Sequence, residues 1–407
     1  MPKLLQINTT LNYGSTGRIA EEIGLTALAG GWECFIAHGP RMKNPSRLKT
    51  IQINGSFDEK IHGGWYSLLC DKHGLGSIGA TKRFVRQIEA IAPDIIHLHN
   101  IHGYYLNYEV LFEYLYRRNI PVVWTLHDCW SFTGHCSHFA FAECDKYKSQ
   151  CDHCPQIGSY PRALFRDNSR NNFRLKKALF ASLGSKLTLV PVSQWLASVV
   201  RESFFSDTVI QVIYNGIDTG VFYPRDAEDI RRKYCIEDKK MILGVASPWG
   251  PRKGYDDFVE LRSYLPDNYV IVLIGLSQAQ IGKLPHGMIG ITRLQNQHLL
   301  ADFYSTTDIV MSLSREETFG MTIAEGFACG TPAVVYNCTA TPELVTPATG
   351  LIVEPGDIRQ LVNAVEKITS DGKESYKNAC LKRAFDHFDK RDRFREYMNL
   401  YNRLINN

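Results

Sequence analysis

The densest group of reactive side chains lies between residues 135 and 155, where the sequence is HCSHFAFAECDKYKSQCDHCP. Its four cysteines, Cys136, Cys144, Cys151 and Cys154, follow the spacing C-x7-C-x6-C-x2-C. Four thiolates can hold a tetrahedral structural zinc ion, and C-x2-C is a common half of such a site. The two longer spacings are less typical, so disulfides and free packed thiols stay open beside structural zinc. Catalytic zinc is not expected, because four cysteine ligands leave no open position.

A second pattern pairs two carboxylates, Glu317 and Glu325, in the stretch SREETFGMTIAEGFACGTP. Glu317 precedes a Thr-Phe-Gly turn, and Glu325 lies inside the helix expected after that turn. Backbone amides at a helix N-terminus bind phosphate, so Phe319, Gly320 and Met321 are expected to form a phosphate contact. A nucleotide sugar, with hydroxyls at both ends and phosphates between them, would satisfy all these groups.

Three other loops carry candidate ligand-binding residues. Arg252 and Lys253 are adjacent in the turn SPWGPRKG and could hold a diphosphate through charge-assisted hydrogen bonds. Gly14 and Gly17 lie between an expected strand and helix, where glycine lets the backbone approach an anion. His127 ends an expected strand in WTLHD and could position a substrate or share a proton. The structural alternatives are a solvated basic turn, a plain glycine turn and a buried hydrogen bond.

Short apolar runs alternate with amphipathic stretches along most of the 407 residues. This alternation indicates βαβ units, and nearly all-apolar strands indicate parallel sheets covered by helices on both faces. We predict an α/β protein of two Rossmann-like, doubly wound domains that face a central cleft. Ligands of such sheets bind beyond the carboxyl ends of the strands, where the candidate loops are expected.

Composition excludes some classes of protein. A net charge of +4 with 22% charged residues argues against a nucleic-acid binder. The start MPKLLQINTT lacks the long apolar stretch of a secretory signal, and no run approaches the ~20 apolar residues of a membrane span. We therefore expect a cytoplasmic protein, in which the eleven cysteines stay reduced.

With these motifs in this order, the sequence resembles the retaining GT-B glycosyltransferases of glycosyltransferase family 4. The motifs are Glu-x7-Glu followed by CGTP at 317–332, NGID at 215–218, RKG at 252–254 and the glycine loop at 14–17. The resemblance covers nearly the whole chain. HDCWSFTGHC with the downstream cysteines is similar to a subgroup that builds bacterial exopolysaccharide, such as colanic acid or capsule.

The resemblance implies a role for each candidate residue. Glu317 would contact hydroxyls of the donor sugar, and Glu325 would hold the ribose. Lys253, with an arginine, would neutralise the diphosphate, and His127 would lie beside the reacting sugar. The family often has a Gly-Arg pair where this chain has ASPWG, so the arginine's role is assigned to Arg252.

The turn-rich connection IYNGIDTGVFYPRD separates two series of alternating strands and helices and suggests the domain limits, which the resemblance helps to label. We place an N-terminal acceptor-side domain at 1–205, with a Cys/His-rich insertion at about 130–160, and a linker at 206–240. The C-terminal nucleotide-sugar domain is expected at 241–385. A final helix at 386–407 is expected to pack back on the N-terminal domain.

The expected function is transfer of a hexose from a UDP- or GDP-sugar to a saccharide acceptor, expected to be lipid-linked, in bacterial surface polysaccharide biosynthesis. Cations and helix amides would stabilise the leaving diphosphate, so transfer would need no cofactor. The alternatives are a GT-B phosphorylase, a sugar-nucleotide epimerase and a non-catalytic carbohydrate-binding protein. A fourth alternative makes the Cys/His loop a redox or metal sensor.

A basic stretch, RDNSRNNFRLKKALFASLG, starts at Arg166. It predicts an amphipathic helix that could lie on an anionic membrane, which would place the enzyme peripherally at the inner face. An ordinary surface helix is the alternative. Its basic residues are Arg170, Arg174, Lys176 and Lys177, interspersed with Phe173, Leu175, Leu179 and Phe180.

Overall fold

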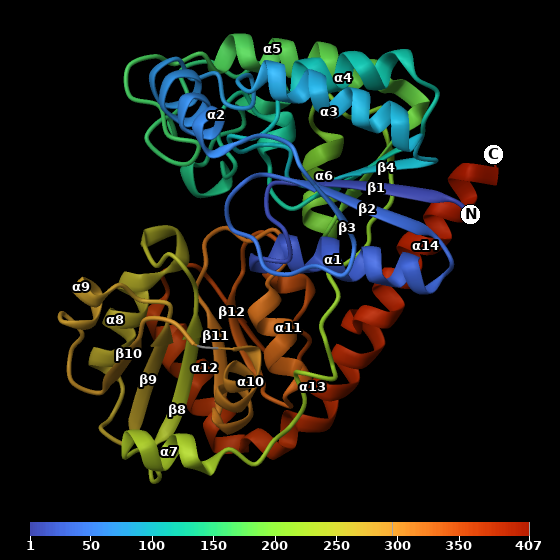
Figure 1. Ribbon diagram of the computed structural model, residues 1–407. Helices are drawn as coiled ribbons and strands as arrows, with labels where there is room; N and C mark the ends of the chain where they lie inside the picture. Colours follow the sequence, from blue (N-terminus) through green and yellow to red (C-terminus); the bar gives the residue numbers. More distant parts are fainter. Residues whose placement is uncertain (295, 407) are drawn as a thin grey trace. The chain divides into compact units, whose positions relative to one another are not determined.

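The computed structural model describes residues 1–294 and 296–406, and the chain divides into two compact units (Figure 1). Unit 1 comprises Met1–Ile213 and the chain from Phe394 onwards, and unit 2 comprises Tyr214–Arg393. Each unit is built around one parallel sheet, as the predicted α/β class requires. Asn407, the last residue of the expected C-terminal helix, lies outside the described residues.

The sheet of unit 1 has seven strands in the order β3-β2-β1-β4-β5-β6-β7, and the neighbouring strands pair in parallel. Every residue of β4, β5 and β6 is buried, as expected for a sheet with helices on both faces. The strands are β1 (Lys3–Asn8), β2 (Glu33–His38), β3 (Lys49–Gln52), β4 (Ile95–Leu98), β5 (Val122–Leu126), β6 (Leu187–Pro191) and β7 (Val209–Ile210).

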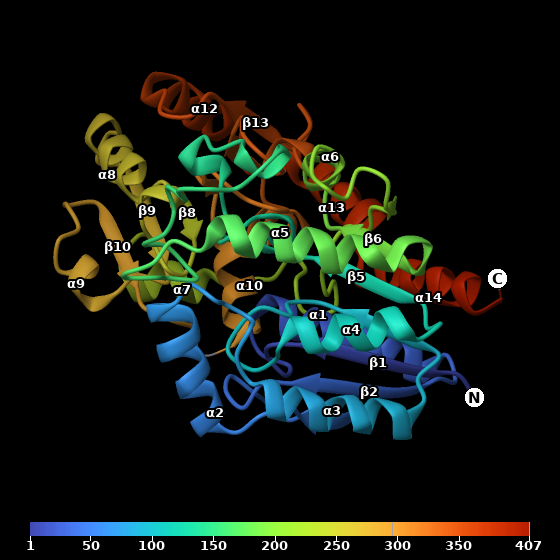
Figure 2. The same ribbon diagram turned by 90° about the horizontal axis from the view of Figure 1, so that it is seen from above.

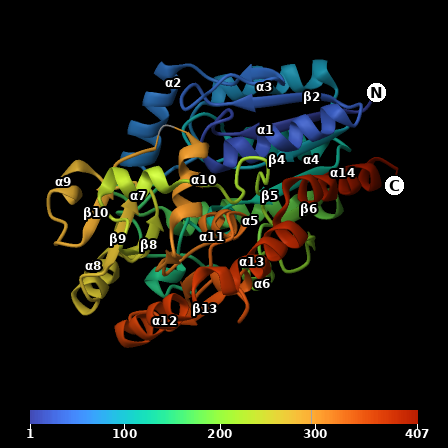
Figure 3. The same cartoon turned by 90° about the horizontal axis from the view of Figure 1, so that it is seen from below.

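The helices of unit 1 cover both faces of this sheet: α3, α4 and α5 lie on one face, and α1 and α14 on the other (Figure 1, Figure 2, Figure 3). In the long segment between β5 and α5, the helical turns are short 3-10 turns. The helices are α1 (Gly14–Ala29), α2 (Ser56–Ile61), the π-helical η1 (His62–Leu69), α3 (Ile78–Ile91), α4 (Tyr108–Arg117), α5 (Ser169–Phe180), α6 (Gln194–Arg201) and α14 (Lys390–Asn406).

Helix α14 joins the core of unit 1 through two tyrosines. The Tyr397 hydroxyl lies 3.0 Å from Thr125 Oγ1, and the Tyr401 hydroxyl lies 2.6 Å from His97 Nδ1. Both rings are buried with apolar residues of α1 and the central strands. The end of the chain is therefore part of the first sheet's packing.

Unit 2 has a six-stranded parallel sheet in the order β10-β9-β8-β11-β12-β13. Its strands are β8 (Lys240–Val245), β9 (Tyr269–Ile274), β10 (Met288–Ile291), β11 (Ile309–Ser312), β12 (Ala333–Tyr336) and β13 (Gly350–Val353). Its helices are α7 (Glu228–Tyr234), α8 (Tyr255–Tyr264), α9 (Gln278–Ile281), α10 (Gln297–Thr306), α11 (Met321–Ala328), α12 (Ile358–Asp371) and α13 (Lys373–Phe388). Across the two described ranges, no helix combines the length and apolar character that crossing a membrane demands.

The predicted basic amphipathic helix exists as α5, but its apolar side faces the core. Phe173 and Phe180 are buried, and so is Lys176, which the sequence interpretation placed on the basic surface. The apolar face is therefore occupied by the protein itself, which corrects the expected membrane contact of this helix. The exposed residues of α5 are Arg170, Asn171, Arg174, Lys177 and Ala178.

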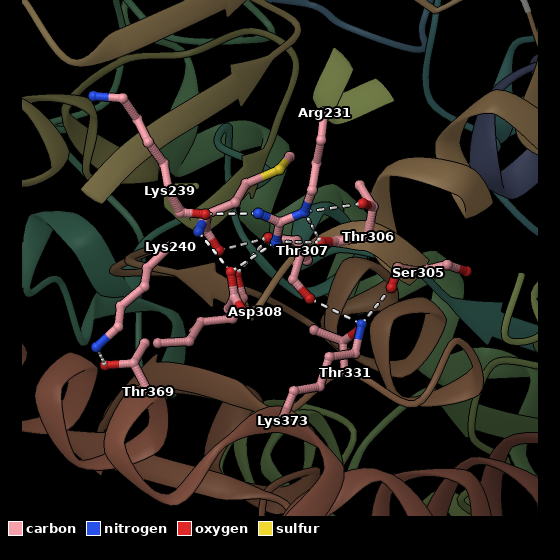
Figure 4. Close-up of polar contacts among 12 residues, drawn as sticks. Arg231, Lys239, Lys240, Ser305, Thr306, Thr307, Asp308, Thr331, Thr369 and Lys373 are labelled. Carbon is pink, nitrogen blue, oxygen red and sulfur yellow. Dashed lines mark hydrogen bonds and ion pairs between the residues drawn. The ribbon is translucent and has the colours of Figure 1, made fainter. Parts of the chain in front are cut away.

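A polar network joins the amino ends of β8 and β11 (Figure 4). Asp308 Oδ2 accepts hydrogen bonds from Arg231 Nη2 at 2.9 Å and from the Met241 N–H at 2.7 Å. Nearby, Lys373 Nζ donates to the carbonyl oxygens of Ser305 and Thr307, which ties α13 to the end of α10. Internal contacts therefore hold the amino ends of these strands. The loops of unit 2 that carry the candidate residues leave from the carboxyl ends of the strands.

Asp308→Asn should lower the free energy of unfolding by about 2 kcal/mol, because Arg231 loses a partly buried, charged partner. Urea denaturation measures this loss. Asp267→Asn is the matched control, since Asp267 also pairs with an arginine but is 88% exposed, and it should cost less than about 0.5 kcal/mol. Equal losses in the two variants would contradict a structural role for the network.

Candidate active site

Two loops of unit 2 start side by side because β8 and β11 pair in parallel, with Met311 opposite Gly244. The loop after β8 carries the RKG turn, and the loop after β11 carries the first glutamate. The Arg315 N–H donates to the Arg252 carbonyl oxygen at 2.9 Å and fastens one loop to the other. Glu317, 64 positions after Lys253 in sequence, is thereby brought to the same end of the sheet as Arg252 and Lys253.

The centre of this edge is an ion pair between Lys253 Nζ and Glu317 Oε1, whose side chains are 15% and 23% exposed. Burial opposes ionisation of Glu317, but the charge and hydrogen bond of Lys253 outweigh it, and the pKa of Glu317 is lowered. The Glu317 N–H donates to Thr339 Oγ1 at 2.9 Å, which fixes the backbone. A charged amine and a charged carboxylate therefore lie together in a partly desolvated position.

Arg252 lies beside this pair. Its Nη1 donates to the Glu316 carbonyl oxygen at 3.1 Å, and its charge also favours the ionised form of Glu317. In the ASPWG stretch, Trp249 is buried, and its Nε1 donates to the Ile274 carbonyl oxygen at 2.8 Å. The arginine nearest the pair in this loop is thus Arg252, the residue to which the sequence interpretation assigned the role.

Helix α11 starts directly after the Thr-Phe-Gly turn. Gly320 has a φ of +107°, a conformation that favours glycine, and no side chain at this N-cap bonds the amides of the first turn. Phe319 is 2% exposed and packs on Phe388 with ring centroids 5.6 Å apart. The Phe319 ring therefore anchors the turn, and a ligand would meet the backbone of Gly320 and Met321 instead.

Glu325 lies further along α11 and is 6% exposed. Its Oε2 accepts a hydrogen bond from the Tyr304 hydroxyl at 3.0 Å. The next residue, Gly326, packs so closely on β11 that a Cβ would meet Val310 Cγ1 at 2.9 Å. Tyr304 thus orients the second carboxylate, a contact that no motif in the sequence indicated.

In unit 1, the neighbouring strands β4 and β5 bring two histidines together at their carboxyl ends. His99 Nδ1 lies 3.1 Å from His127 Nε2, and His99 Nε2 lies 3.0 Å from Gln6 Oε1. Burial lowers the pKa of His127 to about 4, so its ring is neutral at pH 7. A neutral imidazole can share one proton with a substrate hydroxyl without adding charge to the site.

A second chain of hydrogen bonds leads from Asp128 through His102 to Tyr160 at the surface. His102 Nε2 lies 2.7 Å from Asp128 Oδ2, and His102 Nδ1 lies 3.2 Å from the hydroxyl of Tyr160, which is 49% exposed. Burial raises the pKa of Asp128, but His102 and a hydrogen bond from the Trp130 N–H lower it to about 2. The motif WTLHD indicated His127, with Asp128 next to it in sequence, but no motif indicated His102 or Tyr160.

The glycine loop precedes α1. Gly14 is the first residue of α1, with a φ of +67° and open space around its missing Cβ. Gly17 packs tightly, since a Cβ there would lie 2.6 Å from Thr10 Oγ1 and 3.3 Å from the Asn12 amide nitrogen. Internal packing therefore accounts for Gly17, whereas a Cβ at Gly14 would meet open space.

Two family models match the chain, Glycosyltransferase Family 4 over residues 53–221 and Glycosyl transferases group 1 over residues 226–384. The chain belongs to the group 1, family 4 glycosyltransferases. The first model falls mainly in unit 1, and the second falls within unit 2. The predicted family is confirmed.

Among the relatives of this glycosyltransferase is the putative colanic acid biosynthesis glycosyl transferase WcaC of Escherichia coli K12. It is 24% identical over 392 residues, which cover 88% of this chain and 89% of that protein. The lipopolysaccharide core biosynthesis mannosyltransferase LpsB of Rhizobium meliloti is 27% identical over 235 residues, 52% of this chain and 66% of that protein.

Solved structures confirm the predicted GT-B fold. Sucrose-phosphate synthase from Thermosynechococcus elongatus superposes with a TM-score of 0.73 at 18% identity, covering 99% of both chains. Anabaena HepE in complex with UDP and glucose has a TM-score of 0.67 at 15% identity, covering 98% of this chain and 99% of that one.

The glycosyltransferase's structure does not support the zinc site predicted at Cys136, Cys144, Cys151 and Cys154. All four are free thiols that line one small cavity. Within residues 1–294 and 296–406, no three His, Cys, Asp or Glu side chains are grouped to hold a metal ion. Cys136 and Cys154 instead interact with each other, and this contact raises the pKa of the Cys136 thiol and lowers that of the Cys154 thiol.

The loop after His127 is held by the buried Lys176. Its Nζ donates to the carbonyl oxygens of Trp130 and Thr133 at 2.7 and 3.0 Å and lies 3.4 Å from the Trp130 ring centroid. Burial lowers the pKa of Lys176 to about 7. A neutral amine still has two hydrogens for the two carbonyl groups, so the anchor persists without the charge.

Lys176 should make stability rise with pH. Between about pH 7 and 10, the unfolded chain keeps a proton that the folded chain has lost, so the unfolding free energy increases by up to about 1.4 kcal/mol per pH unit. Urea denaturation from neutral to alkaline pH should show this increase in the wild type relative to Lys176→Met. The exposed neighbour provides the control Lys177→Met, which should follow the wild type. Parallel curves for wild type and Lys176→Met would show that Lys176 keeps an ordinary pKa.

Proposed function

We propose that this family 4 enzyme transfers a hexose, with retention of configuration, from a UDP- or GDP-sugar to a saccharide acceptor of bacterial surface polysaccharide. The observation that carries the proposal is the Lys253–Glu317 ion pair beside the N-terminus of α11. HepE, a structural neighbour, is described with UDP and glucose bound, and WcaC and LpsB are described as polysaccharide and lipopolysaccharide enzymes.

The ion pair suggests how the donor would bind. A diphosphate competes with Glu317 for Lys253, and Arg252 and the first amides of α11 supply further positive potential. Release of Lys253 leaves the Glu317 carboxylate free to accept hydrogen bonds from hydroxyls of the donor sugar. Glu325, oriented by Tyr304, would accept hydrogen bonds from the ribose hydroxyls. We assign Gly14 a donor contact through its backbone.

The proposed mechanism depends on the charges that develop on the donor during the reaction. As the bond between sugar and phosphate breaks, positive charge builds on the sugar ring and negative charge on the diphosphate. Lys253, Arg252 and the helix amides stabilise the leaving group, so the proposed transfer requires no cofactor. The acceptor hydroxyl attacks on the face that the phosphate leaves and gives its proton to the phosphate, which retains the configuration. Neutral His127, oriented by His99, would hydrogen-bond a hydroxyl of the reacting sugar.

The acceptor we propose is a lipid-linked saccharide at the inner face of the bacterial membrane, reached by a cytoplasmic enzyme. The support is the description of the relatives as enzymes of colanic acid and lipopolysaccharide biosynthesis. The competing functions are a GT-B phosphorylase and an epimerase, which predict different products, and a non-catalytic carbohydrate-binding protein, which predicts no turnover.

Donor binding is tested by the thermal shift of the purified chain with UDP, GDP, ADP and CMP. One nucleoside diphosphate should raise the Tm, since a ligand at a hundred times its Kd adds about 2.7 kcal/mol of stability. Lys253→Ala and Glu325→Gln should lose the shift. Lys283→Ala and Glu366→Gln, which change exposed residues of unit 2, are the matched controls. No shift with any nucleotide, or equal shifts in all variants, would refute the donor site.

Turnover separates transfer from the competing functions. Incubated with the donor identified by thermal shift and a lipid extract of polysaccharide-producing bacteria, the enzyme should release nucleoside diphosphate only when acceptor is present. Glu317→Gln should lower kcat by about a hundredfold, because it weakens a charged contact made as the sugar becomes positive, while the thermal shift persists. Consumption of donor without acceptor would indicate an epimerase, and sugar phosphate formed with inorganic phosphate would indicate a phosphorylase.

A further inference from the structure

Five large apolar side chains are exposed at one end of unit 1. Three follow one another along α2 and η1 at intervals of four residues: Phe57 is 75% exposed, Ile61 43% and Trp65 62%. Two more lie in the loop before α5, where Leu164 is 46% exposed and Phe165 79%. Single exposed apolar residues are ordinary on soluble proteins, but a group of this kind marks an interaction site.

The two segments are joined to each other. The Leu164 N–H donates to the Leu68 carbonyl oxygen at 2.9 Å, one helical turn beyond Trp65. Nearby, the Tyr160 ring packs on the His73 ring with centroids 5.5 Å apart. The loop therefore lies along the end of η1, and we call the five residues together the apolar patch.

The surroundings of the apolar patch are basic. Lys60, Arg162 and Arg166 are exposed within the same two segments. Asp167, beside Arg166, is also exposed, and its carboxylate accepts hydrogen bonds from the Cys154 and Ser169 N–H groups. Of the acidic residues in α2, Glu59 is only 12% exposed and pairs with Arg41 at 2.6 Å, and Asp58 is half-buried. A partner that covers this face must therefore accommodate the exposed aromatic rings in an apolar layer and carry negative charge that attracts the basic side chains.

We propose that the apolar patch docks unit 1 on an anionic phospholipid membrane, with Lys60, Arg162 and Arg166 on the lipid phosphates. Aromatic and aliphatic side chains enter the headgroup boundary, and each nearby cation adds attraction to the anionic surface. The positive charge of the residues around the apolar patch favours an anionic membrane over a neutral apolar protein surface as the partner. The exposed surface of α5 lacks large apolar side chains and is not part of the proposed contact.

The place of the patch in unit 1 fits the proposed acceptor. Helix α2 lies at the end of unit 1 opposite the chain termini in all three views (Figure 1, Figure 2, Figure 3). It follows β3 in a parallel sheet, so it leaves from the carboxyl-end edge, to which β5 also brings His127. Docking would bring this edge to the membrane where a lipid-linked saccharide is anchored. That consequence rests on the proposed function, whereas the docking itself does not.

The test is cosedimentation of the full chain with sucrose-loaded vesicles of phosphatidylcholine, with or without phosphatidylglycerol, at low and high salt. The wild type should bind the anionic vesicles at low salt. The combined variant Phe57→Ser, Trp65→Ser, Phe165→Ser should reduce the partition coefficient at least about tenfold. Lys60→Glu, Arg162→Glu, Arg166→Glu should also lose binding, and the wild type should release at high salt.

Two control variants match these changes. Tyr264→Ser with Phe385→Ser removes apolar residues that are 58% and 55% exposed on unit 2, and Arg174→Glu with Lys177→Glu reverses charge on α5. Both should bind vesicles as the wild type does. Because all these side chains are exposed, every variant should keep the wild-type Tm and its shift with nucleotide.

Three results would overturn the proposal. The wild type could fail to bind anionic vesicles at low salt, or the α5 variant could lose binding while the patch variants keep it. Light scattering could instead show a dimer that Trp65→Ser dissociates, which would assign the patch to a second copy of the chain. Vesicle binding without any nucleotide shift would refute the proposed function alone and leave the docking surface standing.

Discussion

The candidate donor site depends on the parallel pairing of β8 with β11. This pairing brings the ends of two strands to one edge, so Lys253 and Glu317 meet although 64 residues separate them. In this partly desolvated position, the charge and hydrogen bond of Lys253 keep the Glu317 carboxylate ionised by lowering its pKa. The diphosphate proposed as ligand carries the same sign of charge as Glu317 and would replace it at the lysine, which an uncharged ligand would not do.

The same topology also brings polar side chains together in unit 1. Pairing of β4 with β5 brings His99 to His127, and the loops that follow bring His102 to Asp128. Burial keeps His127 uncharged, whereas His102 and the Trp130 N–H keep the neighbouring Asp128 carboxylate ionised. The adjacent cations Arg252 and Lys253 belong to unit 2, which agrees with the diphosphate proposed to bind there.

Sequence patterns predicted what is local and missed what depends on tertiary contacts. The strand and helix alternation predicted both sheets, and the turns around Lys253 and Glu317 were visible because their residues are adjacent in sequence. Tyr304 could not be found, since it lies 21 residues from Glu325 in another helix. The cysteine spacing could not show whether thiols converge on a metal, because spacing does not determine where a loop without regular structure turns.

Helical periodicity shows which side chains lie on the same face of a helix, but not whether the protein or the solvent covers that face. Phe173, Lys176 and Phe180 have the spacing of one face, and that face is buried with its lysine, so residue type alone misplaced Lys176. Phe57, Ile61 and Trp65 also have the spacing of one face, yet unit 1 leaves that face in solvent. The difference lies in the supporting layer: α5 packs on the turn after β5, while α2 lies at the end of its unit. An apolar face that its own unit leaves uncovered stays in contact with water. Burying that face lowers the free energy only when a partner outside the chain covers it.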